Sequence, residues 1–177
     1  MRIISGTLKG RRLSAPRGSA VRPTSDSLRE TLFNVLGPTL DGARVLDGFA
    51  GTGALGLEAL SRGAAHVTFV ERDAHALAAL RANVAHCGVE EACAIIRDDF
   101  LRVRRLDGPF DLVLLDPPYD LVDLPAVVDR VAAWTAPAGR VVLEHSRRRA
   151  TPEQVGPLTR SRLLTAGDSA LSFYVTP

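Results

Sequence analysis

Strands and helices alternate along the chain from residue 43 onward, and this alternation limits the possible folds more than any other feature of the sequence. Short apolar runs, which are typical of buried strands, are separated by helical stretches that end at or near glycines. The predicted strands are residues 45–47, 67–71, 94–96, 112–116 and 140–144, and the predicted helices are residues 55–61, 74–86 and 127–134. Repeated units of this kind predict an α/β fold with a Rossmann-like, doubly wound and mainly parallel sheet.

Shorter segments flank this alternating region. Two strand-like runs within residues 2–15 surround a turn region with Gly6 and Gly10, which predicts a small N-terminal β-hairpin. A loop rich in proline, glycine and serine follows, and a helix with an apolar face is expected to begin near Thr24. Near the C-terminus, residues 162–164 and 171–175 flank a turn and predict an antiparallel hairpin at one edge of the sheet. We therefore divide the chain into a basic N-terminal extension, residues 1–23, and a main domain, residues 24–177.

The length and composition suit one globular domain in a reducing compartment. The chain has 177 residues, of which 46% are hydrophobic, and this is enough for a sizeable core. We find neither an apolar run of about 18 residues, as a membrane span needs, nor the apolar stretch of a signal peptide. Cys87 and Cys93 show neither metal-ligand spacing nor a disulfide framework. We expect a cytoplasmic protein with no membrane contact.

Positive charge is concentrated at the N-terminus. The formal net charge is only +2, but residues 1–24 contain no acidic residue and carry six basic ones, namely Arg2, Lys9, Arg11, Arg12, Arg17 and Arg22. A local basic patch favours contact with a polyanion such as RNA, and Arg29 is a further candidate closer to the main domain. Any one of these side chains could equally belong to a solvated face, so the prediction rests on the cluster.

Acidic residues stand at the ends of successive predicted strands. They are Asp47, Glu71, Asp98 with Asp99, and Asp116. Ligands of open α/β sheets bind at the carboxyl ends of the strands, so these acids are expected at one edge. Between the first strand and the first helix lies the glycine-rich stretch Asp47-Gly48-Phe49-Ala50-Gly51-Thr52-Gly53-Ala54-Leu55-Gly56. Its glycines fit a dinucleotide pattern, although a tight turn without a ligand would also need them.

The acids favour S-adenosylmethionine over a dinucleotide. A carboxylate at Asp47 would repel a pyrophosphate, whereas it can hold the amino-acid end of S-adenosylmethionine. Glu71, with Arg72 beside it, can accept hydrogen bonds from both ribose hydroxyls. Asp99 can accept from the adenine amine with Phe100 beside the ring, and Asp98 is the competing candidate. Each acid alone could be an ordinary solvated residue at a strand end.

A double proline follows the fourth predicted strand, in the sequence Asp116-Pro117-Pro118-Tyr119. Neither proline can donate a ladder hydrogen bond, so the strand must end at Asp116. The resulting turn presents a carboxylate, free carbonyls and an aromatic ring, which suits a flat base with an exocyclic amine. A plain strand-to-loop turn is the alternative interpretation of these residues.

Together these motifs resemble class I S-adenosylmethionine-dependent methyltransferases that act on exocyclic amines. More narrowly, nearly the whole chain resembles the bacterial RsmD family of 16S rRNA guanine-N2 methyltransferases. The matching segments are residues 2–6, 22–26, 29–34, 49–63 and 167–169. One departure is Gly48, where many relatives have a larger residue, and we expect it to loosen the cofactor loop.

The resemblance implies a seven-stranded sheet with a C-terminal antiparallel hairpin, and methyl transfer to the N2 amine of a guanine. The partner it implies is 16S rRNA, in the small ribosomal subunit or an assembly intermediate, and we expect a monomer without a metal. The implied catalytic residues are Asp116, Pro117, Pro118 and Tyr119. The implied cofactor-binding residues are Asp47, Phe49, Ala50, Gly51, Thr52, Gly53, Glu71, Arg72, Asp98, Asp99 and Phe100.

Three other functions fit part of the sequence. DNA adenine-N6 or cytosine-N4 methyltransferases carry the same Asp-Pro-Pro-Tyr signature, but they usually need a further domain that reads DNA sequence. A small-molecule or protein methyltransferase would have little use for the basic N-terminus. A catalytically silent RNA-binding or ribosome-assembly module would not need the acids at the strand ends.

Overall fold

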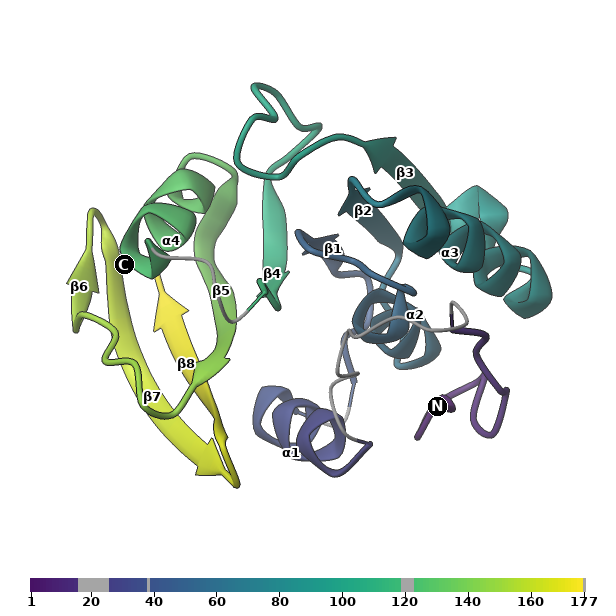
Figure 1. Ribbon diagram of the computed structural model, residues 1–177, viewed down its shortest axis with the longest axis horizontal. Helices are drawn as coiled ribbons and strands as arrows, with labels where there is room; N and C mark the ends of the chain where they lie inside the picture. Colours follow the sequence, from purple (N-terminus) through teal and green to yellow (C-terminus); the bar gives the residue numbers. More distant parts are fainter. Residues whose placement is uncertain (16–25, 38, 119–122, 177) are drawn as a thin grey trace.

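The computed structural model describes residues 1–15, 26–37, 39–118 and 123–176. Its helices are α1 (Asp26–Leu36), α2 (Ala54–Ser61), α3 (Ala74–Cys87) and α4 (Leu124–Ala132), with a 3-10 turn η1 (Glu90–Ala92) after α3. Its strands are β1 (Arg44–Asp47), β2 (His66–Glu71), β3 (Cys93–Arg97), β4 (Phe110–Leu115), β5 (Thr135–Ser146), β6 (Gln154–Val155), β7 (Leu158–Ala166) and β8 (Ser169–Val175). The strands form a single sheet in the order β3-β2-β1-β4-β5-β8-β7-β6 (Figure 1).

The predicted α/β fold is confirmed. β3, β2, β1, β4 and β5 pair in parallel, and β5, β8, β7 and β6 pair in antiparallel fashion. The described residues form eight strands instead of seven, because the two-residue strand β6 adds to the edge of the expected C-terminal hairpin. The helix that we predicted at residues 127–134 is α4, which ends earlier, at Ala132. The strand that we predicted at residues 140–144 is β5, which begins earlier, at Thr135.

Helices cover both faces of the sheet. α1, α2 and α3 pack on one face, against residues that include Val45, Leu114 and Val142. α4 and the loop before β4 pack on the other face, against residues that include Val113 and Leu143 (Figure 1). Within each of β4 and β5, consecutive residues therefore contact opposite layers, as the two-residue repeat of a strand requires. This alternation decides which side chains can meet at the carboxyl edge.

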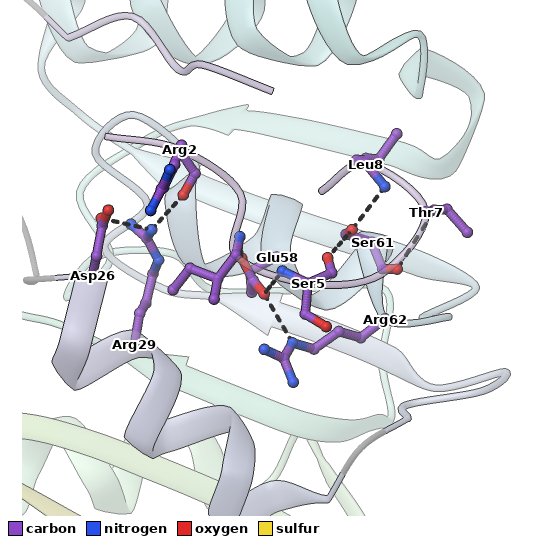
Figure 2. A network of polar contacts seen from close by, with 10 residues as sticks. Arg2, Ser5, Thr7, Leu8, Asp26, Arg29, Glu58, Ser61 and Arg62 are labelled. Carbon is purple, nitrogen blue, oxygen red and sulfur yellow. Dashed lines mark hydrogen bonds and ion pairs between the residues drawn. The ribbon is translucent and has the colours of Figure 1, made fainter. Parts of the chain in front are cut away.

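The N-terminal segment is built into the layer of α1, α2 and α3. Arg2 and Arg12 form an isolated antiparallel bridge, in agreement with the predicted hairpin, and Ile3 and Leu13 belong to the core of that layer. Ile4 and Ser5 donate their backbone N–H groups to the buried carboxylate of Glu58 in α2 (Figure 2). Residues 1–15 are therefore joined to the main domain, and a separate role for residues 1–23 stays a prediction.

Candidate active site

The parallel strands bring the predicted acids to one edge of the sheet. Asp47 ends β1, Glu71 ends β2, Asp98 and Asp99 follow β3, and Asp116 follows β4. β1 lies between β2 and β4, so its loop is central among the strands that carry these acids. The sequence argument from strand ends thus places these residues on a common edge in the structure.

Asp47 is a buried carboxylate with unused hydrogen-bonding capacity. It is only 1% exposed, and its Oδ2 accepts a hydrogen bond of 3.0 Å from the backbone N–H of Gly56. Its Oδ1 is buried and has no hydrogen-bond partner. Burial, together with the nearby charges of Asp116 and Glu71, raises the pKa of this carboxyl to about 7 against the opposing effect of the hydrogen bond from Gly56. A cationic ligand at Oδ1 would satisfy this oxygen and stabilise its ionised form.

The glycine-rich loop turns tightly above Asp47. Gly53 precedes α2 with a φ of 82°, a conformation that favours glycine, and a Cβ there would lie 2.3 Å from Leu80. Gly48 does not loosen the loop as we expected. Its Cβ would lie 2.7 Å from both Leu115 and Phe100, so these side chains already fill the space that a larger residue would take.

Glu71 ties the loop to the end of β2. Its Oε2 accepts from the N–H of Gly51 at 2.7 Å, and its Oε1 accepts from the N–H groups of Arg72 and Asp73, each at 2.7 Å. A carboxylate offers about four acceptor positions, so little capacity remains. Contact with ribose hydroxyls would use the remaining position or replace the bond to Gly51, and the predicted role stays a prediction.

Asp99 is less exposed than Asp98, and both of its carboxylate oxygens have partners within the chain. Asp99 is half-buried and forms an ion pair of 3.0 Å with Arg72, whereas Asp98 is exposed. The ring of Phe100 is only 2% exposed and packs against Phe49, with ring centroids 4.7 Å apart. Phe100 is therefore a core residue, and Phe49 is the half-buried aromatic ring at this edge.

A narrow crevice, with no room for a water molecule, lies beside the double-proline turn. It is lined by Pro117, Pro118 and Leu124 and by residues at the carboxyl end of β5, among them Glu144 and His145, with Arg149. Asp116 is half-buried and Pro117 is buried. The predicted stacking residue Tyr119 lies outside the described residues.

Sequence reasoning missed Glu144, although the same signal of an acid at a strand end marks it. Glu144 lies at the carboxyl end of β5, next to β4, and is only 5% exposed. His145 follows it and contacts the hydroxyl of Ser172 through Nε2 at 2.9 Å. Burial lowers the pKa of His145, although its hydrogen bonds to the backbone of Ser146 and Arg149 oppose the shift. These neighbours anchor the end of β5 against β8.

The basic residues divide into two groups. Arg2, Lys9, Arg11 and Arg12 are exposed, as contact with a polyanion requires, while Arg17 and Arg22 lie outside the described residues. Arg29 is fully buried, which contradicts its predicted role as an RNA contact. Its NH2 group donates to the Arg2 carbonyl at 2.5 Å and to Asp26 at 3.0 Å (Figure 2). Burial lowers the pKa of Arg29 against the attraction of Asp26 and Glu58, and the side chain joins α1 to the N-terminal segment.

Neither a metal-binding cluster of side chains nor a membrane-spanning helix occurs in the described ranges. No group of three or more His, Cys, Asp or Glu side chains in them could hold a metal ion. Within the same ranges, no helix has both the length and the apolar character needed to cross a membrane.

The sheet order, the glycine loop after β1 and the acids at the strand ends define a class I methyltransferase. A family model described as "Conserved hypothetical protein 95" matches residues 1–175, and the chain belongs to this family.

Relatives support this assignment along the whole chain. Ribosomal RNA small subunit methyltransferase D of Escherichia coli strain K12 is 34% identical over 176 residues, covering 98% of this chain and 89% of the relative. The YlbH protein of Bacillus subtilis, named as a candidate rRNA methyltransferase, is 38% identical over 180 residues, covering 98% of both chains. The solved structure of the yhhF protein of Escherichia coli, described as a candidate methyltransferase, has a TM-score of 0.87 at 34% identity, covering 99% of this chain and 97% of that one.

Proposed function

We propose that this protein transfers a methyl group from S-adenosylmethionine to the N2 amine of a guanine in 16S rRNA, within the small ribosomal subunit or an assembly intermediate. The observation that carries the proposal is the position of two sites on neighbouring strands. The glycine loop with the unsatisfied Asp47 oxygen follows β1, and the Asp116-Pro117-Pro118 turn follows β4. The relatives named for action on small-subunit rRNA support the choice of RNA.

The residues at the carboxyl edge fit the cofactor. Bound there, S-adenosylmethionine supplies an electrophilic methyl group on a sulfonium sulfur. The carboxylate of Asp47 would hold the ammonium end, and the backbone at Gly51 and Gly53 would approach the ligand closely, since glycine has no side chain. Glu71 would orient the ribose, and Asp99 would accept from the adenine amine. We expect Phe49, Ala50, Gly51, Thr52 and Gly53 to line the same site.

The double-proline turn would hold the methyl acceptor. The lone pair of the guanine N2 amine is delocalised into the ring, which makes this nitrogen a weak nucleophile. Asp116 and the carbonyl of Pro117 would accept hydrogen bonds from the amine protons, favouring a pyramidal nitrogen with an available lone pair. The nitrogen would bond to the methyl carbon as the carbon–sulfur bond breaks, and the proton that the amine then loses would pass to Asp116 or to water. Catalysis would rest on alignment and on fixed charges near the reacting atoms.

Further contacts would position the RNA. Tyr119 would stack on the base, which contributes roughly 1–3 kcal/mol in nucleic-acid complexes. The exposed residues Arg2, Lys9, Arg11 and Arg12 would contact phosphates, which place the RNA without reading its sequence. A paired target guanine would first have to leave its helix.

The test is transfer of labelled methyl from S-adenosylmethionine to undermethylated small ribosomal subunits, with naked 16S rRNA and duplex DNA in parallel. We expect N2-methylguanosine from the ribosomal samples alone. Asp116→Ala should abolish transfer while RNA binding remains, and the exposed Glu153→Gln is the matched control. Label recovered as methyladenine in DNA would favour a DNA methyltransferase, and a lack of transfer to any RNA would refute the proposal.

A further inference from the structure

The double-proline turn accounts for an amine acceptor but not for the choice of base. Adenine, cytosine and guanine all carry an exocyclic amine, and Asp116 with the Pro117 carbonyl offers each the same two acceptors. What differs is the ring nitrogen beside the amine. In guanine, N1 carries a proton and is a donor, whereas in adenine N1 and in cytosine N3 are acceptors. A site that selects guanine therefore needs a second acceptor next to the first.

Strand register puts a second carboxylate beside Asp116. Leu114 of β4 is the register partner of Val142 of β5, and both belong to the core layer of α1, α2 and α3. Asp116 and Glu144 each follow two residues later, so both are expected on that same face at the carboxyl end of adjacent strands. Neighbouring strands are about 4.8 Å apart, which suits two groups that touch one small ring.

Glu144 lies beside the double-proline turn. It lines the crevice together with Pro117 and Pro118, so its side chain borders the turn that would hold the amine. It is only 5% exposed, and a carboxylate screened from water discriminates strongly between a donor and an acceptor. Arg149 lines the same crevice. Its guanidinium has only N–H donors, and the O6 carbonyl of guanine can accept a hydrogen bond from one of them.

We propose that Glu144 is the residue that selects guanine, by accepting a hydrogen bond from N1–H while Asp116 and the Pro117 carbonyl accept from the two N2 protons. All three donors on this edge of guanine are then matched by acceptors. Adenine or cytosine would place a ring-nitrogen lone pair against Glu144, and the repulsion would exclude them. This inference rests on the proposed function, because it assigns the specificity of the same site.

A substrate that differs from guanine at this edge but keeps the methyl acceptor tests the proposal. The modified guanine is first mapped with wild-type enzyme, and 16S rRNA is then assembled by ligation with guanine or 2,6-diaminopurine at that position. Both bases carry the N2 amine, but N1 of diaminopurine is an acceptor. Subunits reconstituted with each RNA are compared by kcat/KM.

We expect wild-type enzyme to prefer guanine by on the order of 100-fold, since hydrogen bonds to a charged partner are worth about a tenfold to hundredfold factor. Glu144→Gln places a donor opposite N1 of diaminopurine, so the preference should fall at least tenfold. Glu144→Ala should also reduce the preference for guanine over diaminopurine, and it serves as a second variant if Glu144→Gln folds poorly. A purely structural defect would lower both rates equally and leave the ratio unchanged, as should the control Glu153→Gln.

Two results would overturn the inference alone. In one, wild-type enzyme methylates diaminopurine as well as guanine. In the other, wild-type enzyme prefers guanine and both Glu144 variants keep the full preference. Absence of transfer by wild-type enzyme to any guanine is a different result, which overturns the proposed function together with the inference.

Discussion

Replacing Glu58 with glutamine tests how firmly the N-terminal segment is held to the main domain. Glu58 is fully buried in α2, and its carboxylate accepts from the N–H groups of Ile4 at 2.7 Å and Ser5 at 3.0 Å. It also accepts from Nε of Arg62 at 2.9 Å, and the Arg62 side chain is only 5% exposed. Figure 2 shows Ser5 and Arg62 on either side of the Glu58 carboxylate.

The expected cost follows from what the amide leaves unpaired. Glutamine keeps the shape but has a single acceptor oxygen, and its NH2 group would face donors. Breaking one side of a buried ion pair costs about 3–5 kcal/mol, and an unsatisfied buried N–H costs about 1–3 kcal/mol. These contributions overlap, and Arg62 keeps its contact over the Phe33 ring at 4.8 Å. We therefore expect Glu58→Gln to lower the free energy of unfolding by about 3–5 kcal/mol.

Urea unfolding at pH 7 measures the loss, and hydrogen exchange locates it. The amides of Ile4 and Ser5 should exchange faster in Glu58→Gln than in wild type. Glu153→Gln removes a carboxylate that is 90% exposed and 3.8 Å from Arg160, so it should change stability by less than about 0.5 kcal/mol. A loss below about 1 kcal/mol, or a larger loss without faster exchange at those two amides, would refute the reasoning.

Three further predictions concern the cofactor loop and its surroundings. The folded-state pKa of Asp47 is about 7, above its usual 3.8, so this carboxyl favours folding at pH below about 4 and loses that contribution as the pH rises through 7. The stability of wild type relative to Asp47→Asn should fall over this pH range in thermal melts, and a constant difference would contradict the raised pKa. Asn83→Ala should cost about 1–3 kcal/mol in urea unfolding, because a buried amide with three hydrogen bonds is lost. Gly48→Val should lower the free energy of unfolding by about 1–3 kcal/mol in urea unfolding, because the new side chain overpacks against Leu115 and Phe100. An unchanged free energy of unfolding would show that the loop shifts to make room.

The alternation of strands and helices was sufficient to predict the fold, because each element carries its own period and its own end signals. Asp73 and Gly88, for example, cap α3 at its two ends, and both residue types are typical of these cap positions. The start of β5 was not predictable in the same way. Residues 135–139 include a proline and a glycine, and Thr135 pairs with Phe110 of β4 before the register shifts and pairing resumes at Arg140.

The argument from strand ends placed the predicted acids at one edge of the sheet, where the structure has them, whereas the argument from charge was wrong for Arg29. Arg29 follows the basic N-terminal segment, but it lies one turn before Phe33 on the apolar side of α1, and that spacing indicated burial. Glu58 is the one charged residue in the sequence of α2, which suggests that it has a buried partner. Arg62 follows four residues later, and this spacing predicts that the two side chains pair. Its other partners, Ile4 and Ser5, are 54 and 53 residues away in sequence and emerge only from the fold.

Asn83 connects the N-terminal segment with the cofactor loop. Asn83 in α3 is 1% exposed, and it accepts from the N–H of Ser14 at 2.8 Å and donates to the Ser14 carbonyl at 3.0 Å. Its amide also donates to the carbonyl of Thr52 at 2.9 Å, within the glycine loop. A single buried amide thus fixes the end of the described N-terminal segment against the loop that would hold the cofactor. Because the N-terminal residues also share a core with α1 and α2, the exposed arginines of residues 1–15 lie on a segment that is packed against the main domain next to the cofactor loop.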